Sequence, residues 1–186
     1  SQHRISGYQG GQKRAFVVTS RQFDLVVTRW AARYRGLTYP CAVGRGGIGD
    51  KLGEGDNITP RGTFEIACAG YRADRMAQPA FGVPVQPIGP ADIWSDDPRD
   101  PDYNHGITAR KHPYSFERLP RPDSMYDIFA VLTFNWPDPT PGAGSAIFLH
   151  NWRNPRHPTA GCVAFAPPVL RFILENWQSG ARVVIR

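Results

Sequence analysis

The sequence lacks a long apolar run. No uninterrupted run exceeds five residues, the length of Ile128-Phe129-Ala130-Val131-Leu132, far short of the roughly 20 residues that cross a bilayer. The sequence also has few of the charged and aliphatic repeats that build helical bundles and coiled coils. Glycine and proline instead number 19 and 18 among 186 residues, while hydrophobic residues make up 41%. Because that hydrophobic content is too high for a disordered chain, the composition predicts one ordered domain, rich in strands and loops, without a membrane-spanning segment.

Cysteine is scarce as well. The three cysteines, Cys41, Cys68 and Cys162, are an odd number without Cys-x-x-Cys spacing, which excludes a zinc ribbon and a disulfide-dense scaffold. Cys41 and Cys68 each lie in an apolar run that is typical of a strand. They are therefore either two buried thiols or a disulfide pair.

The chain carries a net charge of +6, which suits an anionic partner. No polybasic run and no basic stripe interleaved with aromatic residues is present, so we expect no nucleic-acid partner. An anionic polymer, or simply a solvated basic surface, fits this distribution. The scattered basic residues include Arg14, Arg21, Arg29, Arg33, Arg35, Arg45, Lys51, Arg110 and Lys111.

Short apolar or alternating runs bounded by turn residues recur along the chain and predict a mainly β domain. They cover residues 15–19, 25–30, 37–43, 62–68, 128–135, 145–150, 163–166 and 182–185. One helix is predicted near the C-terminus. It begins at Pro167-Pro168 and ends at Gly180, and its apolar face consists of Val169, Phe172, Ile173 and Trp177.

The strand pattern stops between residues 69 and 127. Nine prolines fall between positions 79 and 122 of this segment, together with five aspartates between positions 92 and 102. Aromatic side chains in the segment can pack, and too few residues follow for a second domain. We therefore interpret residues 69–127 as an ordered, proline-stiffened flap, rather than a mobile loop or linker, inserted into a catalytic domain of residues 15–186. Residues 1–14 then form an N-terminal extension.

A glycine-rich stretch imitates a nucleotide-binding motif. Gly44-Arg45-Gly46-Gly47-Ile48-Gly49 satisfies the Gly-x-Gly-x-x-Gly pattern, but residues 51–57 contain too many helix breakers to open the helix that would hold a pyrophosphate. A phosphate-binding loop is excluded too, since Asp50 precedes Lys51 and no Ser or Thr follows the lysine. We interpret residues 44–62 as a turn that joins two strands.

The segment from position 148 to position 165 carries the most informative pattern. His150 ends one strand-like run, and Thr159-Ala160-Gly161-Cys162 forms a turn that opens the next. Neighbouring strand ends can hold an imidazole and a thiol within hydrogen-bond reach. The imidazole can then take the thiol proton to give the nucleophilic thiolate. Because Gly161 permits a tight turn, the amides of Gly161 and Cys162 are expected to point at a developing oxyanion.

Two other interpretations of this segment compete with catalysis. A His/Cys pair can simply be packing, and His150, His157 and Cys162 are also potential zinc ligands. No fourth His or Cys lies nearby, and the apolar flanks lack carboxylates that would orient the ligands, so we expect no metal. His157 is then a solvated loop histidine or a substrate contact.

The segment His150…Thr159-x-Gly161-Cys162-Val163 resembles the signature of YkuD-type L,D-transpeptidases. Two separated motifs in the family's order make the resemblance specific, and it covers residues 15–185. The second motif consists of Gly44-x-Gly46-Gly47, Lys51, Glu54-Gly55-Asp56 and Thr59-Pro60-x-Gly62-x-Phe64.

The resemblance implies a YkuD-like β-sandwich that carries the proline-rich insertion and one C-terminal helix, and that acts on peptidoglycan stem peptides. Cys162 would be the nucleophile and His150 the base, oriented by the main-chain carbonyl of Asn151, with no cofactor. Family members form a thioester and transfer the acyl group to the side-chain amine of meso-diaminopimelate. Water as acceptor would instead give an L,D-carboxypeptidase or amidase.

Two features depart from the family pattern. Ala160 stands where most members carry a second His, and Ala164-Phe165 stands where an Arg or Asn follows the Cys. The missing polar group leaves open a non-catalytic peptidoglycan-binding module. The variant turn, residues 100–104, Tyr126-Asp127 and the insertion are similar to an alpha- and betaproteobacterial branch, whose members can form 1,3-crosslinks from L-Ala to diaminopimelate. We therefore favour 1,3-crosslinking over 3,3-crosslinking.

Donor and acceptor stem peptides are the partners that the resemblance implies, and Arg45, Lys51 or Arg153 would hold their carboxylates. The resemblance also implies export to the periplasm, the signal peptide being already absent from this sequence, and acylation by carbapenems. We expect a monomer. Further candidate substrate contacts are Tyr103, Asn104, Tyr126, Thr159 and His157, of which the first three are equally well explained as structural residues of the insertion.

Overall fold

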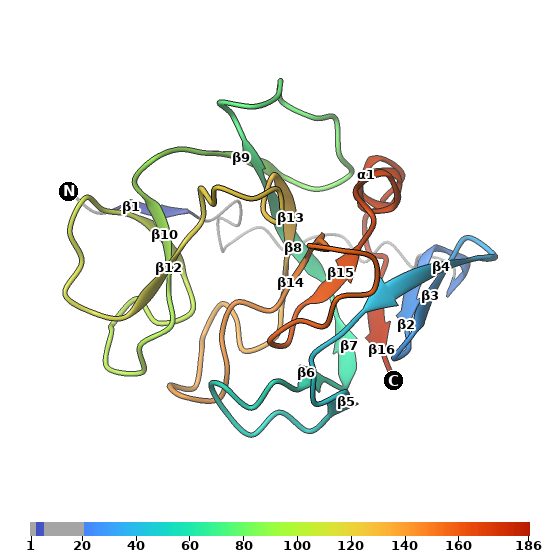
Figure 1. Cartoon of the computed structure of the whole chain (residues 1–186), viewed down its shortest axis with the longest axis horizontal. Coiled ribbons are helices and arrows are strands. Elements are labelled where there is room, and N and C mark those ends of the chain that lie inside the picture. The colour runs from blue at the N-terminus through green and yellow to red at the C-terminus, as the bar shows by residue number, and fades with distance from the viewer. Residues whose placement is uncertain (1–2, 6–20) are drawn as a thin grey trace.

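A computed structural model describes residues 3–5 and 21–186, so the strand expected over residues 15–19 lies outside the described residues. Within these residues the fold is mainly β, as the sequence predicted, and has one short α-helix (Figure 1). Its strands are β1 His3–Ile5, β2 Leu25–Val27, β3 Ala31–Tyr34, β4 Leu37–Ala42, β5 Ile48–Gly49, β6 Thr59–Pro60, β7 Gly62–Phe64, β8 Ile66–Arg72, β9 Val85–Ile88, β10 Asp92–Ser95, β11 Gly106–Thr108, β12 Phe116–Arg118, β13 Ile128–Leu132, β14 Phe148–Asn151, β15 Val163–Phe165 and β16 Val183–Ile185.

Ten of these strands form one sheet in the order β7-β16-β2-β3-β4-β15-β14-β13-β8-β9. Side chains from its two halves share one buried core: Leu25 and Val27 of β2 lie in the same apolar cluster as Leu149 of β14 and Phe165 of β15. Leu170 of the helix joins this cluster. The sheet therefore folds over its own inner face, as expected for a β-sandwich.

Strand β13 is buried on both faces. Ile128, Ala130 and Leu132 belong to the inner core, whereas Phe129 and Val131 belong to a second apolar cluster on the outer face. Successive side chains of a strand point to opposite faces, so a strand covered on both sides has no place for polar residues. This explains why the apolar run of residues 128–132 is a strand.

The insertion supplies the outer layer. Trp94 and Leu119 belong to the outer cluster together with Tyr126, and the rings of Trp94 and Phe148 meet edge to face with centroids 4.9 Å apart. Strands β10, β11 and β12 of the insertion form a small sheet with β1, in the order β1-β11-β10-β12 (Figure 1).

The expectation that residues 69–127 contain no strands is wrong. Strand β8 continues to Arg72, and β9 to β12 follow within the segment. Strands β9 to β12 have only three or four residues each, too few for a clear alternation. Strand β9 contains Pro87. The proline is tolerated there because β9 lies at the edge of its sheet.

The helix α1 spans Pro167–Glu175 and begins at the two prolines, as predicted. Its predicted apolar face and its end need correction. The buried helical residues are Leu170, Ile173 and Leu174, whereas Phe172 is 37% exposed. Trp177 is buried but follows the helix, where its ring stacks on Tyr34 with centroids 6.0 Å apart. The helix ends before Asn176, because the chain turns early to place Trp177 in the core; Gly180 serves a later turn.

Neither Cys41 nor Cys68 forms a disulfide, so the paired alternative is wrong. The two residues lie in different apolar clusters, Cys41 in the inner one and Cys68 in the outer one. Burial raises the pKa of the Cys41 thiol to about 12.

Within residues 3–5 and 21–186, no helix is long and apolar enough to cross a membrane.

Candidate active site

The turn that carries Cys162 requires glycine at position 161. Gly161 has φ +148°, and a Cβ there would lie 3.0 Å from the carbonyl oxygen of Ile58 and 3.3 Å from the Ile147 side chain. Thr159 fixes the turn from within: its Oγ1 accepts a hydrogen bond from the Gly161 amide (3.1 Å) and donates one to the Cys162 carbonyl (2.6 Å). The Gly161 amide is therefore already bonded, and the oxyanion role expected for it would require this bond to break.

The glycine-rich stretch braces the same turn from outside. Thr59 Oγ1 accepts a hydrogen bond from the Gly44 amide (2.8 Å) and donates one to the Gly161 carbonyl (2.8 Å). Gly44 must be glycine, because a Cβ would lie 2.2 Å from the Asn57 carbonyl oxygen. Residues 44–62 are more than a turn, since β5 and β6 pair in parallel within them. The glycine-rich family-like motif thus supports the motif that carries Cys162.

Thr59→Val should remove both hydrogen bonds of the Thr59 hydroxyl, to the Gly44 amide and to the Gly161 carbonyl. Valine keeps the shape but leaves a buried amide and a buried carbonyl without a partner, so unfolding free energy is expected to fall by about 1–3 kcal/mol. Thr59→Ser retains the hydroxyl and is expected to remain close to wild type. Urea unfolding of the three proteins checks this; a Thr59→Val protein as stable as Thr59→Ser would show that the brace contributes nothing.

Strand register brings the thiol and the imidazole together. Strands β14 and β15 are parallel, with Leu149 opposite Val163. Cys162 precedes Val163 and therefore lies beside Phe148, whose amide donates a hydrogen bond to Sγ (3.4 Å). His150 is two residues beyond Phe148 and lies on the same face, because side chains alternate along a strand. Both groups thus face the outer layer, where the ring of Tyr126 contacts that of His150 with centroids 5.5 Å apart.

The surroundings of the Cys162 thiol favour its protonated form. Sγ donates a hydrogen bond to the main-chain oxygen of Ala146 (3.1 Å). Burial raises the pKa of the thiol to about 12; the negative charge of Glu117 adds to this, while the Phe148 amide and the Lys51 ammonium oppose it. At neutral pH the resting nucleophile is a thiol, not a thiolate.

His150 is neutral and its tautomer is fixed. Burial lowers the pKa of His150 to about 4. Its Nδ1 lies 2.7 Å from the main-chain oxygen of Asn151, the contact that the sequence analysis expected. Since a carbonyl oxygen only accepts hydrogen bonds, Nδ1 carries the proton and Nε2 has the free lone pair. The imidazole is therefore prepared to accept a proton at Nε2.

The rate of Cys162 alkylation should follow the high thiol pKa. Since only the thiolate reacts, the iodoacetamide rate at Cys162 is expected to rise about tenfold per pH unit from pH 7 to pH 10. Peptide mass mapping separates this rate from any reaction at the buried Cys41 and Cys68. A rate that is already constant above pH 7 would indicate a preformed thiolate–imidazolium pair and would contradict the neutral resting state.

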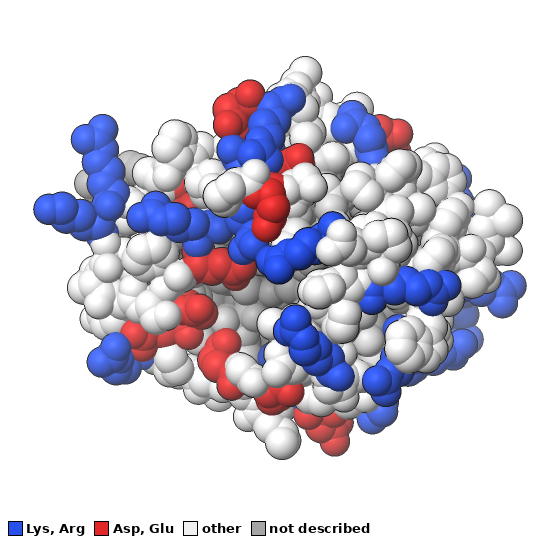
Figure 2. Space-filling view, viewed as in Figure 1, with Lys and Arg blue, Asp and Glu red and all other residues white. Residues whose placement is uncertain are grey.

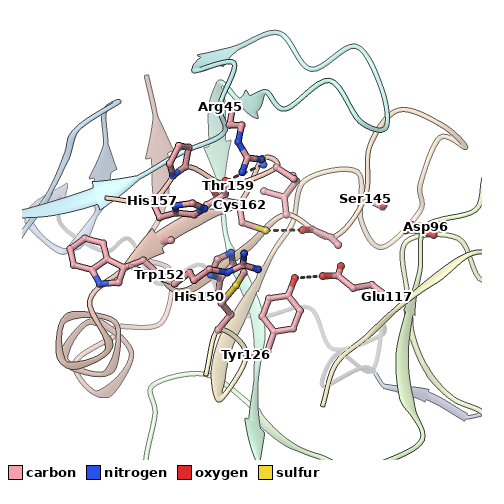
Figure 3. Close-up of a pocket in the computed structure, with 18 of the residues that line it drawn as sticks. Arg45, Asp96, Glu117, Tyr126, Ser145, His150, Trp152, His157, Thr159 and Cys162 are labelled. Atoms are coloured by element: carbon pink, nitrogen blue, oxygen red, sulfur yellow. Dashed lines mark hydrogen bonds between the residues drawn. The ribbon is translucent and has the colours of Figure 1, made fainter. Parts of the chain in front are cut away.

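A cleft of about 400 Å³ opens over Cys162 and His150. Figure 3 places Asp96 and Glu117, both from the insertion, on one side of the thiol, and Arg45 and His157 on the other. In the space-filling view, acidic side chains gather on the left and lower sides of a central hollow, and basic side chains border it above and on its right (Figure 2). The cleft is therefore electrostatically two-sided, with the nucleophile between its walls.

Glu117 and Tyr126 form a polar pair beside the thiol (Figure 3). The Tyr126 hydroxyl donates a hydrogen bond to Glu117 Oε1. Burial raises the pKa of Glu117 and raises that of Tyr126 well above its ordinary value. Tyr126 was predicted from the sequence, but Glu117 was not, because Phe116-Glu117-Arg118 belongs to no motif. Only the position of Glu117 in the folded cleft identifies it.

The structure does not place Tyr103 and Asn104 on the cleft, and their buried contacts fit the structural alternative. Tyr103 is 2% exposed; its hydroxyl donates to Glu54 Oε1 (2.5 Å) and accepts from the Gly144 amide (3.1 Å). Asn104 is also 2% exposed and accepts a hydrogen bond from the Ala146 amide (2.9 Å). Both side chains hold the segment that covers Cys162 instead of facing the cleft.

The remaining residues expected to contact substrate differ in whether their polar groups are free to bind it. Arg45, Arg153 and His157 line the cleft, and the Arg153 side chain is 54% exposed. Thr159 lines it too, although its hydroxyl holds the turn. Lys51 is 4% exposed in its side chain and donates to Asp56 (2.7 Å) and the Ile58 carbonyl (3.0 Å). The Lys51 ammonium therefore already pairs with Asp56 inside the protein, so it does not suit a substrate carboxylate.

Lys51 also sets the ionisation of its partner. Burial by itself would raise the pKa of Asp56, but the Lys51 ammonium and the amides of Ile58 and Leu52 lower it to about 2. The pair therefore persists throughout the neutral range.

As for metals, no group of three or more His, Cys, Asp or Glu side chains in the described part of the chain is arranged to hold an ion.

The chain was compared with known proteins. A family model, YkuD, described as the L,D-transpeptidase catalytic domain, matches residues 12–185. The searches of curated proteins and of solved structures gave no match. Because the family model covers nearly the whole chain, and the Cys162 turn and its brace consist of the residues that carry the resemblance, the chain belongs to the YkuD family and is an L,D-transpeptidase catalytic domain.

Proposed function

We propose that this domain crosslinks peptidoglycan by acyl transfer through a thioester on Cys162, with His150 as the base and the Asn151 carbonyl as the group that orients it. The observation that carries this assignment is the shared cleft: a thiol and a neutral imidazole face it, and Nε2 of the imidazole is left as a proton acceptor. Nucleophile and base need this arrangement for cysteine acyl transfer.

The reaction begins when the donor carbonyl reaches Sγ of Cys162. The thiol proton passes to Nε2 of His150 as sulfur attacks the carbonyl carbon. His150 then gives this proton to the leaving amine, the carbon–nitrogen bond breaks, and a thioester remains. The acceptor amine attacks the thioester and gives its proton to His150, which returns it to sulfur as the new amide is released.

The two walls of the cleft suit a substrate that carries both charges. The side-chain amine of meso-diaminopimelate is flanked by a carboxylate, and we propose that this amine is the acyl acceptor. Asp96 and Glu117 line one wall and suit an ammonium group, whereas Arg45 and Arg153 line the cleft and suit carboxylates, although the Arg153 guanidinium also lies 4.0 Å from an Asp123 carboxylate oxygen. Arg121 also lines the cleft, but its Nε and Nη2 both donate to the Asp123 carboxylate (2.9 and 2.7 Å).

We further propose that the bond formed is a 1,3-crosslink between L-Ala and diaminopimelate. The support is the resemblance to the 1,3-forming branch at the variant turn with Ala160 and at the insertion, which supplies the acidic wall of the cleft. Since stem peptides of this kind lie outside the cytoplasmic membrane, we propose that the domain acts in the periplasm.

Incubation with purified muropeptides tests this function. Tandem mass spectrometry of the products should reveal dimers in which the donor stem beyond L-Ala has been lost. Dimers that retain diaminopimelate in both stems would indicate 3,3-crosslinking, and shortened monomers alone would indicate transfer to water. Full recovery of the starting muropeptides, with no adduct on the protein, would contradict the proposal.

Glu117→Gln should change two properties in opposite directions. Glutamine can still accept the Tyr126 hydroxyl, but removing the negative charge lowers the pKa of the Cys162 thiol, so alkylation at pH 8.5 is expected to become about threefold faster. Use of the cationic acceptor should weaken, with its KM rising about tenfold. Steady-state kinetics with a fixed donor measures the second effect. A variant that matches wild type in both measurements would remove Glu117 from the substrate-binding wall.

A further inference from the structure

Asn104 of the insertion uses the full hydrogen-bonding capacity of its side chain. Its Oδ1 accepts from the Trp94 indole (3.0 Å) and from the Ala146 amide (2.9 Å). Its Nδ2 donates to the main-chain oxygens of Asn135 (2.6 Å) and Phe134 (3.4 Å). A side-chain amide has two acceptor sites and two donor hydrogens, so an aspartate or a leucine could not make all four contacts.

Asn104 thereby connects the insertion to the nucleophile. The amide of Ala146 is bonded to Asn104, and the carbonyl of the same residue accepts the thiol of Cys162 (3.1 Å). Tyr103, the preceding residue of the insertion, binds the Gly144 amide two positions earlier. Two consecutive residues of the insertion, Tyr103 and Asn104, thus hold Gly144 and Ala146 of the segment that covers Cys162.

Ala146 needs this support because its backbone conformation is unfavourable. Its φ is +53°, in the left-handed region that residues with a Cβ seldom occupy. Such a conformation persists only where the surroundings impose it, and here the Asn104 bond to the Ala146 amide does so. The amide and the carbonyl of Ala146 belong to adjacent peptide units joined at its Cα, so without that bond φ and ψ of Ala146 are free to relax and to turn the carbonyl away from Sγ.

We propose that Asn104 is a positioning residue that acts on Cys162 through Ala146, so that the insertion holds the nucleophile as an oriented, protonated thiol until substrate enters the cleft. A hydrogen bond from the thiol to a carbonyl stabilises the neutral form, and the carbonyl dipole disfavours a thiolate. An incoming donor peptide displaces Sγ from Ala146 and leaves Nε2 of His150 as the acceptor for its proton. This inference rests on the proposed role of Cys162 as the nucleophile.

The test compares Asn104→Leu with Trp94→Phe. Asn104→Leu removes the bond to Ala146, whereas Trp94→Phe removes a different bond to the same amide and leaves the Ala146 link in place. For Asn104→Leu we expect the alkylation profile of Cys162 to shift to lower pH, with about tenfold faster reaction at pH 8. Its kcat for acyl transfer should fall about tenfold with KM changed less than twofold. Trp94→Phe should stay within about twofold of wild type in these measurements.

Alkylation needs no substrate, so this result is independent of whether the domain forms crosslinks. An unchanged alkylation profile in Asn104→Leu, or the same shift in Trp94→Phe, would overturn the proposal. If Asn104→Leu does not fold, the infrared S–H band of Cys162 in the wild-type protein, isolated by subtracting the spectrum of Cys162→Ala, decides instead. A band shifted to lower frequency by hydrogen bonding supports the proposal, and a band at the position of a free thiol contradicts it.

Discussion

Cys162→Ala should abolish crosslinking and every trace of a covalent adduct, while the protein remains folded. Alanine removes the atom that attacks the donor carbonyl, and no other group of the cleft described above replaces a thiol. The side chain is small and lies at the edge of the outer apolar cluster, so the loss of packing is modest. Muropeptide turnover by liquid chromatography, together with thermal unfolding, separates loss of chemistry from loss of fold.

Cys41→Ala provides the matched control. Its thiol lies in the inner core and donates a weak hydrogen bond to the Thr28 carbonyl (3.4 Å), outside the cleft. The substitution is therefore expected to lower stability but to leave turnover by the folded fraction unchanged. Crosslinking activity that survives in Cys162→Ala, or disappears in Cys41→Ala at full folding, would show that the nucleophile has been misassigned.

His150→Gln should lower kcat/KM by about 10²- to 10⁴-fold, the usual contribution of a general base. The glutamine amide can still donate to the Asn151 carbonyl, but it cannot accept the thiol proton. Acyl-enzyme formation with a muropeptide donor, followed by intact-protein mass spectrometry, should become correspondingly slow. Direct alkylation of Cys162 at pH 10 should change much less, because hydroxide then removes the proton.

His157→Gln is the control for His150. Both histidines line the cleft, but His157 is only partly buried and belongs to the loop before the nucleophile turn. We expect its substitution to raise KM several-fold and to leave kcat nearly unchanged, as for a residue that contacts substrate without moving a proton. If His157→Gln reduced kcat as strongly as His150→Gln, the base would have to be reassigned.

The sequence predicted the parts of the fold and site that depend on local pattern. Alternating apolar runs identified most strands of the large sheet, and Pro167-Pro168 marked the start of the helix. The turn at Gly161-Cys162 was recognisable because only a few residue types allow its geometry and chemistry. The proximity of His150 and Cys162 followed from strand ends, although their register needed the structure.

Other features depend on contacts between distant segments and left no local signal. Glu117 and Cys162 share a cleft only because the insertion packs on the outer face of the sheet. Asn104 is polar and lies in a loop, a pattern typical of a surface contact, yet its partners at Ala146 and Asn135 lie some forty and thirty positions away and bury it. The strands of the insertion are too short to show a period.

The most direct test is to observe the intermediate itself. Wild-type protein mixed with a purified stem-peptide donor in the absence of acceptor should gain the mass of the acyl group, on the tryptic peptide that contains Cys162, and lose it when an acceptor amine is added. Appearance of crosslinked product should match that loss. Product formed without any adduct on Cys162, or an adduct that the acceptor amine does not discharge, would contradict acyl transfer through this thiol.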